Sequence, residues 1–363
     1  MPSRPMSLRQ SIPAILAVAS LLAACNSGAT VSPLAAGTLS PGDSAPPSVP
    51  PATPSADQSA VPSAPPTLGF SWPDGDEPAV TREQTGLDGA YINPGAIIEH
   101  EGEFHMFGNI FTSWPGHVDF PHLVSTDGAT WELVSDEPAF TSDDVPFAHP
   151  GADVSSGFVA ADGTWVLVVQ SVNAAAPWEI GLATAPGPDG PWTVQPEPVL
   201  TAGSSGSIDS AGLAWPSVVA TDDGFAMYYT AFVTPRRNGV IARATSPDGF
   251  TWTKDDGAVL TAEAAWEGIG LDRPRVARTA DGYVMLYAGA LLTTRGAAFS
   301  EDGIEWRRDG DAPVITDEDF PVDGRAWDCA LVNRDGTLTY YLEIGIAAAS
   351  IGTQIYRATA ELP

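Results

Sequence analysis

Pairs of apolar segments recur along the chain, and a short turn containing glycine separates the two segments of each pair. "PSVVA" and "FAMYYTAF" flank Gly224, "PRVAR" and "YVMLYAGA" flank Gly282, and "ALVN" and "TLTYYLEI" flank Gly336. Two earlier turns, at Gly102 and Gly163, have the same character. Aspartate precedes the glycine in four of the five turns, and Asp-Gly between apolar segments predicts a β-hairpin.

A second turn follows each of the first four hairpins and ends in tryptophan. The segments are "STDGATW", "APGPDGPW", "SPDGFTW" and "SEDGIEW", which end at Trp131, Trp192, Trp252 and Trp306. In such a turn aspartate caps backbone amides, glycine takes a positive φ, and a strand led by a large aromatic residue follows. Consecutive hairpin glycines lie 54 to 61 residues apart, so each repeat predicts four antiparallel strands.

Four-stranded units repeated around a ring form a β-propeller, so the repeats predict an all-β fold with five blades. The last repeat ends at "IYRATAEL" without the second turn and its tryptophan. We expect the segment "FSW", Phe70 to Trp72, to complete this blade and close the ring. The predicted propeller spans residues 70–363.

The N-terminal residues predict a different organisation. Arg4 and Arg9 precede an apolar run and then Cys25 in the context "LAAC", a pattern typical of a secretory signal in residues 1–25. It resembles the lipobox of bacterial lipoproteins, which implies lipidation of Cys25 and an extracytoplasmic, membrane-anchored protein; the alternative is a cleaved signal peptide with an incidental cysteine. Residues 26–69 are rich in Pro, Ser, Ala and Thr and predict a disordered tether.

Composition narrows the choice of partners. The chain has 45 acidic and 16 basic residues and a formal net charge of -29, which argues against nucleic acid or anionic lipid as a partner. Cys329 is the only cysteine besides Cys25, so no disulfide within a monomer and no cysteine metal site are expected. We expect a monomer that needs no cofactor.

The repeat pattern resembles a known superfamily. Five predicted blades, "NPG" at Asn93 to Gly95 and the "SxDGxxW" turns are similar to the five-bladed glycoside hydrolases of families 43, 32, 62, 68, 117 and 130. The turns also resemble the Asp box of sialidases, but they are one residue shorter between Asp and Trp, and sialidases have six blades. The resemblance implies a carbohydrate substrate in the central channel.

In a propeller the innermost strands begin around one opening of the central channel, which we call the mouth. The links from second to third strands reach the same end. Carboxylates and arginines there can form bidentate hydrogen bonds with sugar hydroxyls, and aromatic rings can stack on sugar rings. The candidate substrate-binding residues are Asn93, His149, Trp215, Arg236, Arg273, Arg295, Trp327 and Glu343, with His117 and Arg237 near them.

Glycoside hydrolysis needs two carboxyl groups, and Asp272 in "GLDRPRV" is the first candidate. The resemblance to family 43 implies a general acid two residues before the fourth-blade proline, where Asp272 stands in place of Glu. The same resemblance implies carboxylates at two further positions. This chain has Asn93 and Trp215 there, and neither side chain can act as a base. "LDRPRV" also resembles a catalytic segment of family 130. The phosphorylases of that family hold phosphate with basic residues. By this resemblance Arg273, Arg275 or the pair Arg236 and Arg237 could fill the same role.

Asp153 and Asp328 are the candidate catalytic partners of Asp272. Asp153 and Asp272 each lie ten residues before their hairpin glycine, and Asp328 lies eight residues before Gly336, on the same strand face by period two. The alternative for each is a structural role, capping a turn or pairing with an arginine. The other histidines, His100, His105 and His122, lack metal-ligand spacing, as does His149, so no metal is predicted.

Three functions remain open from the sequence. The first is a surface-anchored glycosidase that uses Asp272 as general acid with Asp153 or Asp328. The second is a non-catalytic carbohydrate-binding lipoprotein, favoured by Asn93 and Trp215 at positions where the resemblance implies carboxylates. The third is a propeller that is purely structural or binds a protein partner. The sequence leaves open the sugar, the linkage, hydrolysis or phosphorolysis, and retention or inversion.

Overall fold

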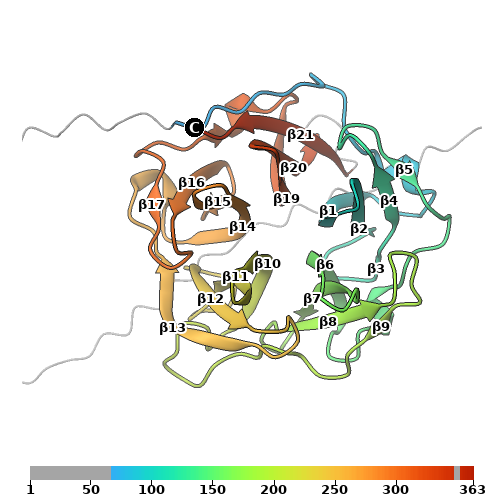
Figure 1. The fold of residues 1–363 in the computed structure, drawn as a ribbon, viewed down its shortest axis with the longest axis horizontal. Coiled ribbons are helices and arrows are strands. Elements are labelled where there is room, and N and C mark those ends of the chain that lie inside the picture. Colours follow the sequence, from blue (N-terminus) through green and yellow to red (C-terminus); the bar gives the residue numbers. More distant parts are fainter. Residues whose placement is uncertain (1–66, 347–351) are drawn as a thin grey trace, which may run out of the picture. The chain divides into compact units, whose positions relative to one another are not determined.

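The computed structural model describes residues 67–346 and 352–363, and these form a five-bladed β-propeller. The predicted signal segment, Cys25 and most of the predicted tether lie outside the described residues. Figure 1 shows the blades around a central channel, with β1, β6, β10, β14 and β19 innermost. The predicted fold class is therefore confirmed.

Each blade is an antiparallel sheet whose strands follow one another in sequence from the channel outward. Blade one contains β1 (Tyr91–His100), β2 (Glu103–Phe111), β4 (His122–Ser125) and β5 (Glu132–Leu133), with β3 (Val118–Asp119) beside β2. Blade two contains β6 (Pro150–Val159), β7 (Trp165–Asn173), β8 (Ile180–Ala185) and β9 (Thr193–Val194). Blade three contains β10 (Leu213–Thr221), β11 (Gly224–Ala231), β12 (Val240–Ser246) and β13 (Thr253–Leu260).

Blades four and five follow the same plan. Blade four contains β14 (Leu271–Thr279), β15 (Gly282–Gly289), β16 (Thr294–Ser300) and β17 (Arg307–Arg308), with β18 (Ile315–Thr316) beside β16. Blade five contains β19 (Gly324–Arg334), β20 (Thr337–Ile346) and β21 (Thr353–Glu361). The described chain has four 3₁₀ turns, namely η1 (Arg82–Thr85) before β1, and η2 (Ser142–Asp144), η3 (Ala265–Glu267) and η4 (Asp317–Asp319) between later strands.

The N-terminal end of the described chain completes blade five. Ser71 and Thr359 exchange backbone hydrogen bonds of 2.9 and 2.8 Å, and Val80 pairs in the same way with Ile355 of β21. The predicted closure by the "FSW" segment is confirmed. Joining the two ends of the propeller in one sheet leaves β21 without a free edge at these positions.

Three of the four tryptophan turns have the predicted hydrogen bonds; in the fourth, "APGPDGPW", Pro191 has no N–H to donate, and the amide of Gly190 bonds the carbonyl of Gly187 at 3.1 Å. Asp248 Oδ1 accepts hydrogen bonds of 2.8 Å from the backbone amides of Phe250 and Thr251, and Gly249 has φ +84°. The equivalent turns at Asp127 and Asp302 form the same pair of bonds. These aspartates shape the fold and lie far along the strands from the mouth.

The apolar core is divided into layers between consecutive blades. At least one buried cluster lies between each neighbouring pair of blades, including the pair formed by blades five and one, and a second one lies between blades two and three. Burying apolar surface on both faces of every sheet is what holds a ring of flat blades together. The innermost strands are thereby fixed around the channel, so their first residues occupy defined positions at the mouth.

Candidate functional site

A register shift near the start of every innermost strand shapes the mouth. The shifts fall between Asn93 and Ala96, Val154 and Ser156, Ala214 and Ser217, Asp272 and Arg275, and Ala326 and Cys329. Trp215 and Arg273 take positive φ angles of 49° and 51° at this point. A β-bulge re-aims the side chains beside it, which places the residues next to the bulges around the channel.

Polar residues of the second strands hold these bulges in place. Asn109 bonds both the N–H and the C=O of Val154 in the next blade, at 2.8 Å each, and Gln170 accepts a hydrogen bond from the amide of Trp215. Thr230 accepts one of 3.1 Å from the amide of Arg273. Sequence reasoning missed these three residues. The available signal was a polar side chain inside an apolar strand, as in "VLVVQSV".

Asp272 is held at the mouth by three donors. Its Oδ1 accepts hydrogen bonds from Thr230 Oγ1 at 3.1 Å and from the Arg273 amide at 2.9 Å, and its Oδ2 is 3.0 Å from Arg273 Nη1. The side chain is 19% exposed. Burial raises the pKa of Asp272, although Arg273 and the hydrogen bonds oppose this rise. The carboxyl group is therefore oriented, reachable and inclined to hold a proton.

Blade five contributes two more carboxyl groups to the mouth, those of Asp328 and Glu343. Asp328 Oδ1 accepts 2.8 Å hydrogen bonds from Arg275 Nη2 and from the amide of Cys329. Glu343 Oε2 accepts one of 3.2 Å from the Asp328 amide. Burial, followed by repulsion from Asp328, raises the pKa of Glu343 to about 8. Asp328 thus has a cationic partner, whereas Glu343 is a carboxyl group that favours its neutral form.

Asp153 belongs to the same electrostatic group. Its side chain is buried, Gln170 Nε2 donates a 3.2 Å hydrogen bond to Oδ2, and Oδ1 has no hydrogen-bond partner among the described residues. Burial, followed by the charges of Asp328 and Glu343, raises the pKa of Asp153 well above its usual range. Closely spaced carboxyl groups cannot all ionise. The fold has therefore brought together all three predicted catalytic aspartates, and it adds Glu343 to them.

Aromatic side chains form a row along the mouth from blade one to blade three. Neighbouring ring centroids lie 5.3 to 6.4 Å apart. The row consists of Tyr91, Phe111, Trp114, Trp178, Trp215 and Phe232. Trp114 is 41% exposed, whereas Trp178 and Trp215 are buried. Among these residues only Trp215 was a sequence candidate, because the others lie in links or strands outside the repeat positions used to find the mouth.

Two arginines stack on this row. The guanidinium carbon of Arg273 lies 3.9 Å from the centre of the Trp215 ring, and that of Arg236 lies 5.6 Å from the centre of the Trp178 ring. Stacking on an aromatic face fixes the orientation of a guanidinium without neutralising its charge.

The other candidate substrate-binding residues from the sequence differ in how far they are buried. Asn93 is buried and accepts a 2.6 Å hydrogen bond from Asn109. Arg295 is fully buried and donates to the carbonyls of Leu292, Thr294 and Trp327, so it supports Trp327, which is 37% exposed.

The predicted histidine candidates also differ. His149 is exposed just before β6, and its backbone amide bonds the side chain of Asn173. His117 is held by Asp119 and Asp143 at 3.0 and 3.2 Å. His105 and His122 lie away from the mouth, buried against each other at 3.1 Å.

A small cavity opens beside Asp272. It has a volume of about 160 Å³ and lies between the β11–β12 link, with Arg236 and Arg237, and the segment from Ile269 to Asp272. We call it the arginine cavity. Its position next to a carboxyl group with a raised pKa makes it the cavity most relevant to chemistry.

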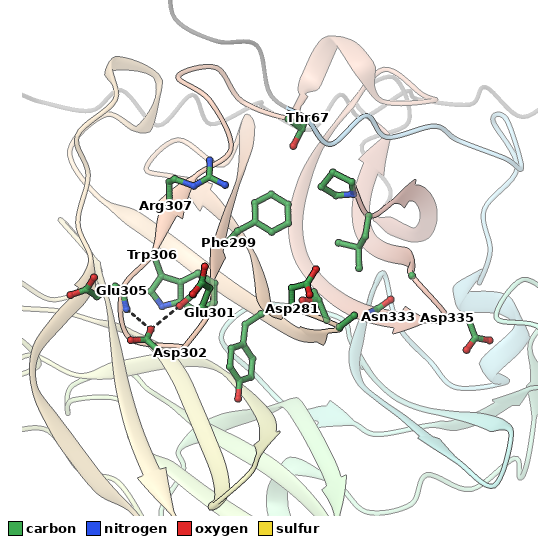
Figure 2. Close-up of a pocket in the computed structure, with 17 residues that line it drawn as sticks. Thr67, Asp281, Phe299, Glu301, Asp302, Glu305, Trp306, Arg307, Asn333 and Asp335 are labelled. Atoms are coloured by element: carbon green, nitrogen blue, oxygen red, sulfur yellow. Dashed lines mark hydrogen bonds between the residues drawn. The ribbon is translucent and has the colours of Figure 1, made fainter.

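A larger cavity, of about 1170 Å³, lies elsewhere, at the hairpin-turn ends of blades four and five. Figure 2 shows Asp302, Glu305 and Trp306 on one side of it and Asn333 and Asp335 on the other. This cavity contains none of the candidate catalytic residues. Its size therefore does not make it the catalytic centre.

Neither a metal-ligand cluster nor a spanning helix is found in the described residues. Across residues 67–346 and 352–363, no three His, Cys, Asp or Glu side chains are arranged to hold a metal ion. No helix in the same part of the chain is both long and apolar enough to cross a membrane.

Comparison with known proteins identifies the fold. No protein-family model matches the sequence, and no curated protein does. Among solved structures, a glycosyl hydrolase from Bacteroides ovatus is similar with 17% identity and a TM-score of 0.60, covering 80% of this chain and 93% of that one. A thermostable family-43 glycoside hydrolase has 14% identity and a TM-score of 0.58, over 74% and 88% of the two chains.

A third structure comes from family 130, described as mannoside phosphorylases that include glycoside hydrolases targeting β-1,2 mannosidic linkages in Candida mannan. It has 17% identity and a TM-score of 0.58, over 82% of this chain and 96% of that one. These similarities show that the chain shares the five-bladed fold of glycoside hydrolases, as the sequence resemblance implied.

Proposed function

We propose that this protein is a glycoside hydrolase that cleaves a glycan bound at the mouth of the propeller. The observation that carries the proposal is the group of four carboxyl side chains from blades two, four and five, namely Asp153, Asp272, Asp328 and Glu343. Three of them have a raised pKa, which is typical of catalytic acids. The chain also shares its fold with known glycoside hydrolases, but it is the site and not the fold that carries the functional argument.

We assign the role of general acid to Asp272. It is the carboxyl group that lines the arginine cavity, its pKa is raised by burial, and Thr230 and the Arg273 amide fix its orientation. A protonated Asp272 can donate its proton to the glycosidic oxygen as the bond to the leaving group breaks. Because the acid is oriented before substrate binds, little reorganisation is needed in the transition state.

Asp328 is the better of the two partners. Its ion pair with Arg275 suits a carboxylate that attacks the anomeric carbon or removes a proton from water. Asp153 has a pKa well above its usual range, so it suits a proton-sharing role beside Asp328. Trp114, an exposed member of the aromatic row, would stack on a sugar ring.

A non-catalytic carbohydrate-binding protein is the second candidate. The observation in its favour is Asn93, an amide that is buried and bonded to Asn109 where the resemblance to family 43 implies a catalytic base. In this case the carboxyl groups would only bind sugar hydroxyls.

Location outside the cytoplasm, with a lipid anchor on Cys25, belongs to the same proposal. It rests on the "LAAC" context and the Pro/Ser/Ala-rich segment that follows it. Mass spectrometry of the membrane fraction would detect acyl chains on Cys25 and the loss of residues 1–24.

The test is a screen of neutral and charged glycans with the purified protein, followed by Asp272→Asn. We expect the variant to lose at least 100-fold in turnover, the contribution of a general acid, while a fold check by circular dichroism is unchanged. Asp256→Asn, an exposed aspartate of β13, is the matched control and should keep full activity. Unchanged turnover in Asp272→Asn would eliminate the mechanism, and binding without any cleavage would favour the second candidate.

A further inference from the structure

Some basic residues of this chain form ion pairs with carboxylates and others do not. Fourteen arginine and lysine side chains lie in the described part of the chain, and nine of them form ion pairs with carboxylates. The five that form none within residues 67–346 and 352–363 are Arg236, Arg237, Arg295, Arg307 and Arg325. Four of these five lie at the mouth, on the β11–β12 link or at the starts of β16 and β19. Arg307 lies in β17, in the larger cavity.

Unpaired arginines are unexpected in so acidic a protein. With 45 acidic residues against 16 basic ones, a carboxylate partner is readily found elsewhere on the surface. A net charge of -29 also repels anions from most of the molecule. Apart from the fully buried Arg295, the unpaired guanidinium groups at this opening therefore provide a local exception, and their natural ligand is an anion.

Arg236 and Arg237 are the members of this group that line a cavity. Arg236 stacks on Trp178 and has φ +56°, and the amide of Arg237 bonds the carbonyl of Thr234 at 3.0 Å. The link therefore presents Arg236 beside the aromatic row, and both arginines line the cavity. Asp272 lines the same cavity.

The size of the arginine cavity limits what it can hold. Its volume of about 160 Å³ equals that of about five water molecules. This is room for one charged sugar residue or its charged group, with the rest of a glycan outside. A guanidinium matches the two oxygens of a carboxylate in geometry as well as charge.

We propose that the arginine cavity is a subsite for a uronic acid residue of the glycan, whose carboxylate is bound by Arg236 and Arg237. The proposal rests on the proposed function, because it places the uronate beside Asp272 in the same substrate. It names an acidic glycan as the substrate class. Free inorganic phosphate offers the same anionic chemistry and is distinguished by the experiment.

The experiment is affinity electrophoresis of the full chain in gels that contain polygalacturonate, alginate or hyaluronan, each compared with its carboxyl-reduced form. Because protein and polymer are both anionic, nonspecific attraction is weak and retardation reports a specific site. We expect at least one acidic polymer to retard the protein and its reduced form to have at least tenfold weaker effect. Raising the salt concentration should weaken the retardation.

The variant Arg236→Gln/Arg237→Gln should lose the retardation. Arg307→Gln, which changes an unpaired arginine outside the mouth, should keep it. Thermal unfolding of each variant checks that the fold is intact. Equal retardation by the reduced polymers, or no effect of the double substitution, would overturn the uronate subsite.

Two further arms separate the alternatives. Inorganic phosphate and free galacturonate or glucuronate are each added as competitors. If phosphate abolishes retardation at a concentration equal to or lower than the uronate requires, the cavity selects phosphate and the proposal is overturned. Asp272→Asn should still be retarded, because it keeps both arginines. Retardation in a protein that cleaves no glycan would refute the hydrolase while leaving the subsite in place, so the two failures are distinguishable.

Discussion

Arg275 Nη2 lies 2.8 Å from Asp328 Oδ1, and this ion pair joins blades four and five at the centre of the propeller. Both side chains are buried, with 4% and 9% of their side-chain surface exposed. The same guanidinium donates to the carbonyls of Trp215 in blade three and Cys329 in blade five. Arg275 is therefore a structural centre as well as a part of the candidate site.

We predict that Arg275→Met lowers the free energy of unfolding by about 3–5 kcal/mol, because it leaves the buried Asp328 carboxylate without its cationic partner and several carbonyls without their guanidinium donor. Urea denaturation measures the change. The matched control is Arg278→Met on the same strand, whose partner Asp222 has a side chain that is 86% exposed; its loss should stay below about 1 kcal/mol. Equal losses in the two variants would contradict a special role for the buried pair.

A second prediction concerns Glu343 at alkaline pH. Its pKa is raised from 4.5 to about 8 in the folded state. Between these values the folded protein holds a proton that the unfolded chain has released, so stability falls as the pH rises, by up to about 1.4 kcal/mol per pH unit. Glu343→Gln keeps an acceptor for the Asp328 amide and removes the titration.

Unfolding measured by urea between pH 5 and 8 tests this prediction. The variant should be stabilised relative to the natural protein at pH 8 more than at pH 5. If the difference between the two proteins is the same at both values, Glu343 does not carry the titration. The stability curve would then point to another carboxyl group of the mouth.

A third prediction concerns the buried histidines of blade one on the acid side. Burial, with a contribution from His105, lowers the pKa of His122 from 6.5 to about 3. Between these values the unfolded chain binds a proton that the folded protein excludes, so stability falls as the pH drops below about 6.5. His122→Gln should flatten this part of the curve.

His117→Gln is the contrasting control. Burial lowers the pKa of His117, but hydrogen bonds to Asp119 and Asp143 outweigh it, so the pKa is raised overall. Its contribution to stability is present below its unfolded pKa and is lost as the pH rises through the folded value. Thermal unfolding from pH 4 to pH 8 should therefore show opposite changes in the two variants, and changes of the same sign would refute the assignment.

Much of the candidate site could be found from the sequence. The repeat register placed Asp153, Asp272 and Asp328 at the starts of inner strands, where the structure has them, because the distance from a hairpin turn is fixed within a strand. It did not find Thr230 or Trp178. Their roles depend on contacts with the next blade, which strand periodicity does not encode.

The fold was determined by the sequence alone, because the turn residues and apolar runs of each repeat act locally and recur five times. The tertiary structure decided which side chains share the channel and which of them hold protons. The raised pKa of Asp153 depends on its burial and on the charges of Asp328 and Glu343, and Glu343 lies 190 residues later in the chain, so only the closed fold brings the two within electrostatic reach. The five arginines without an ion pair in residues 67–346 and 352–363 likewise become visible only in the tertiary structure, because pairing is a property of neighbours in space.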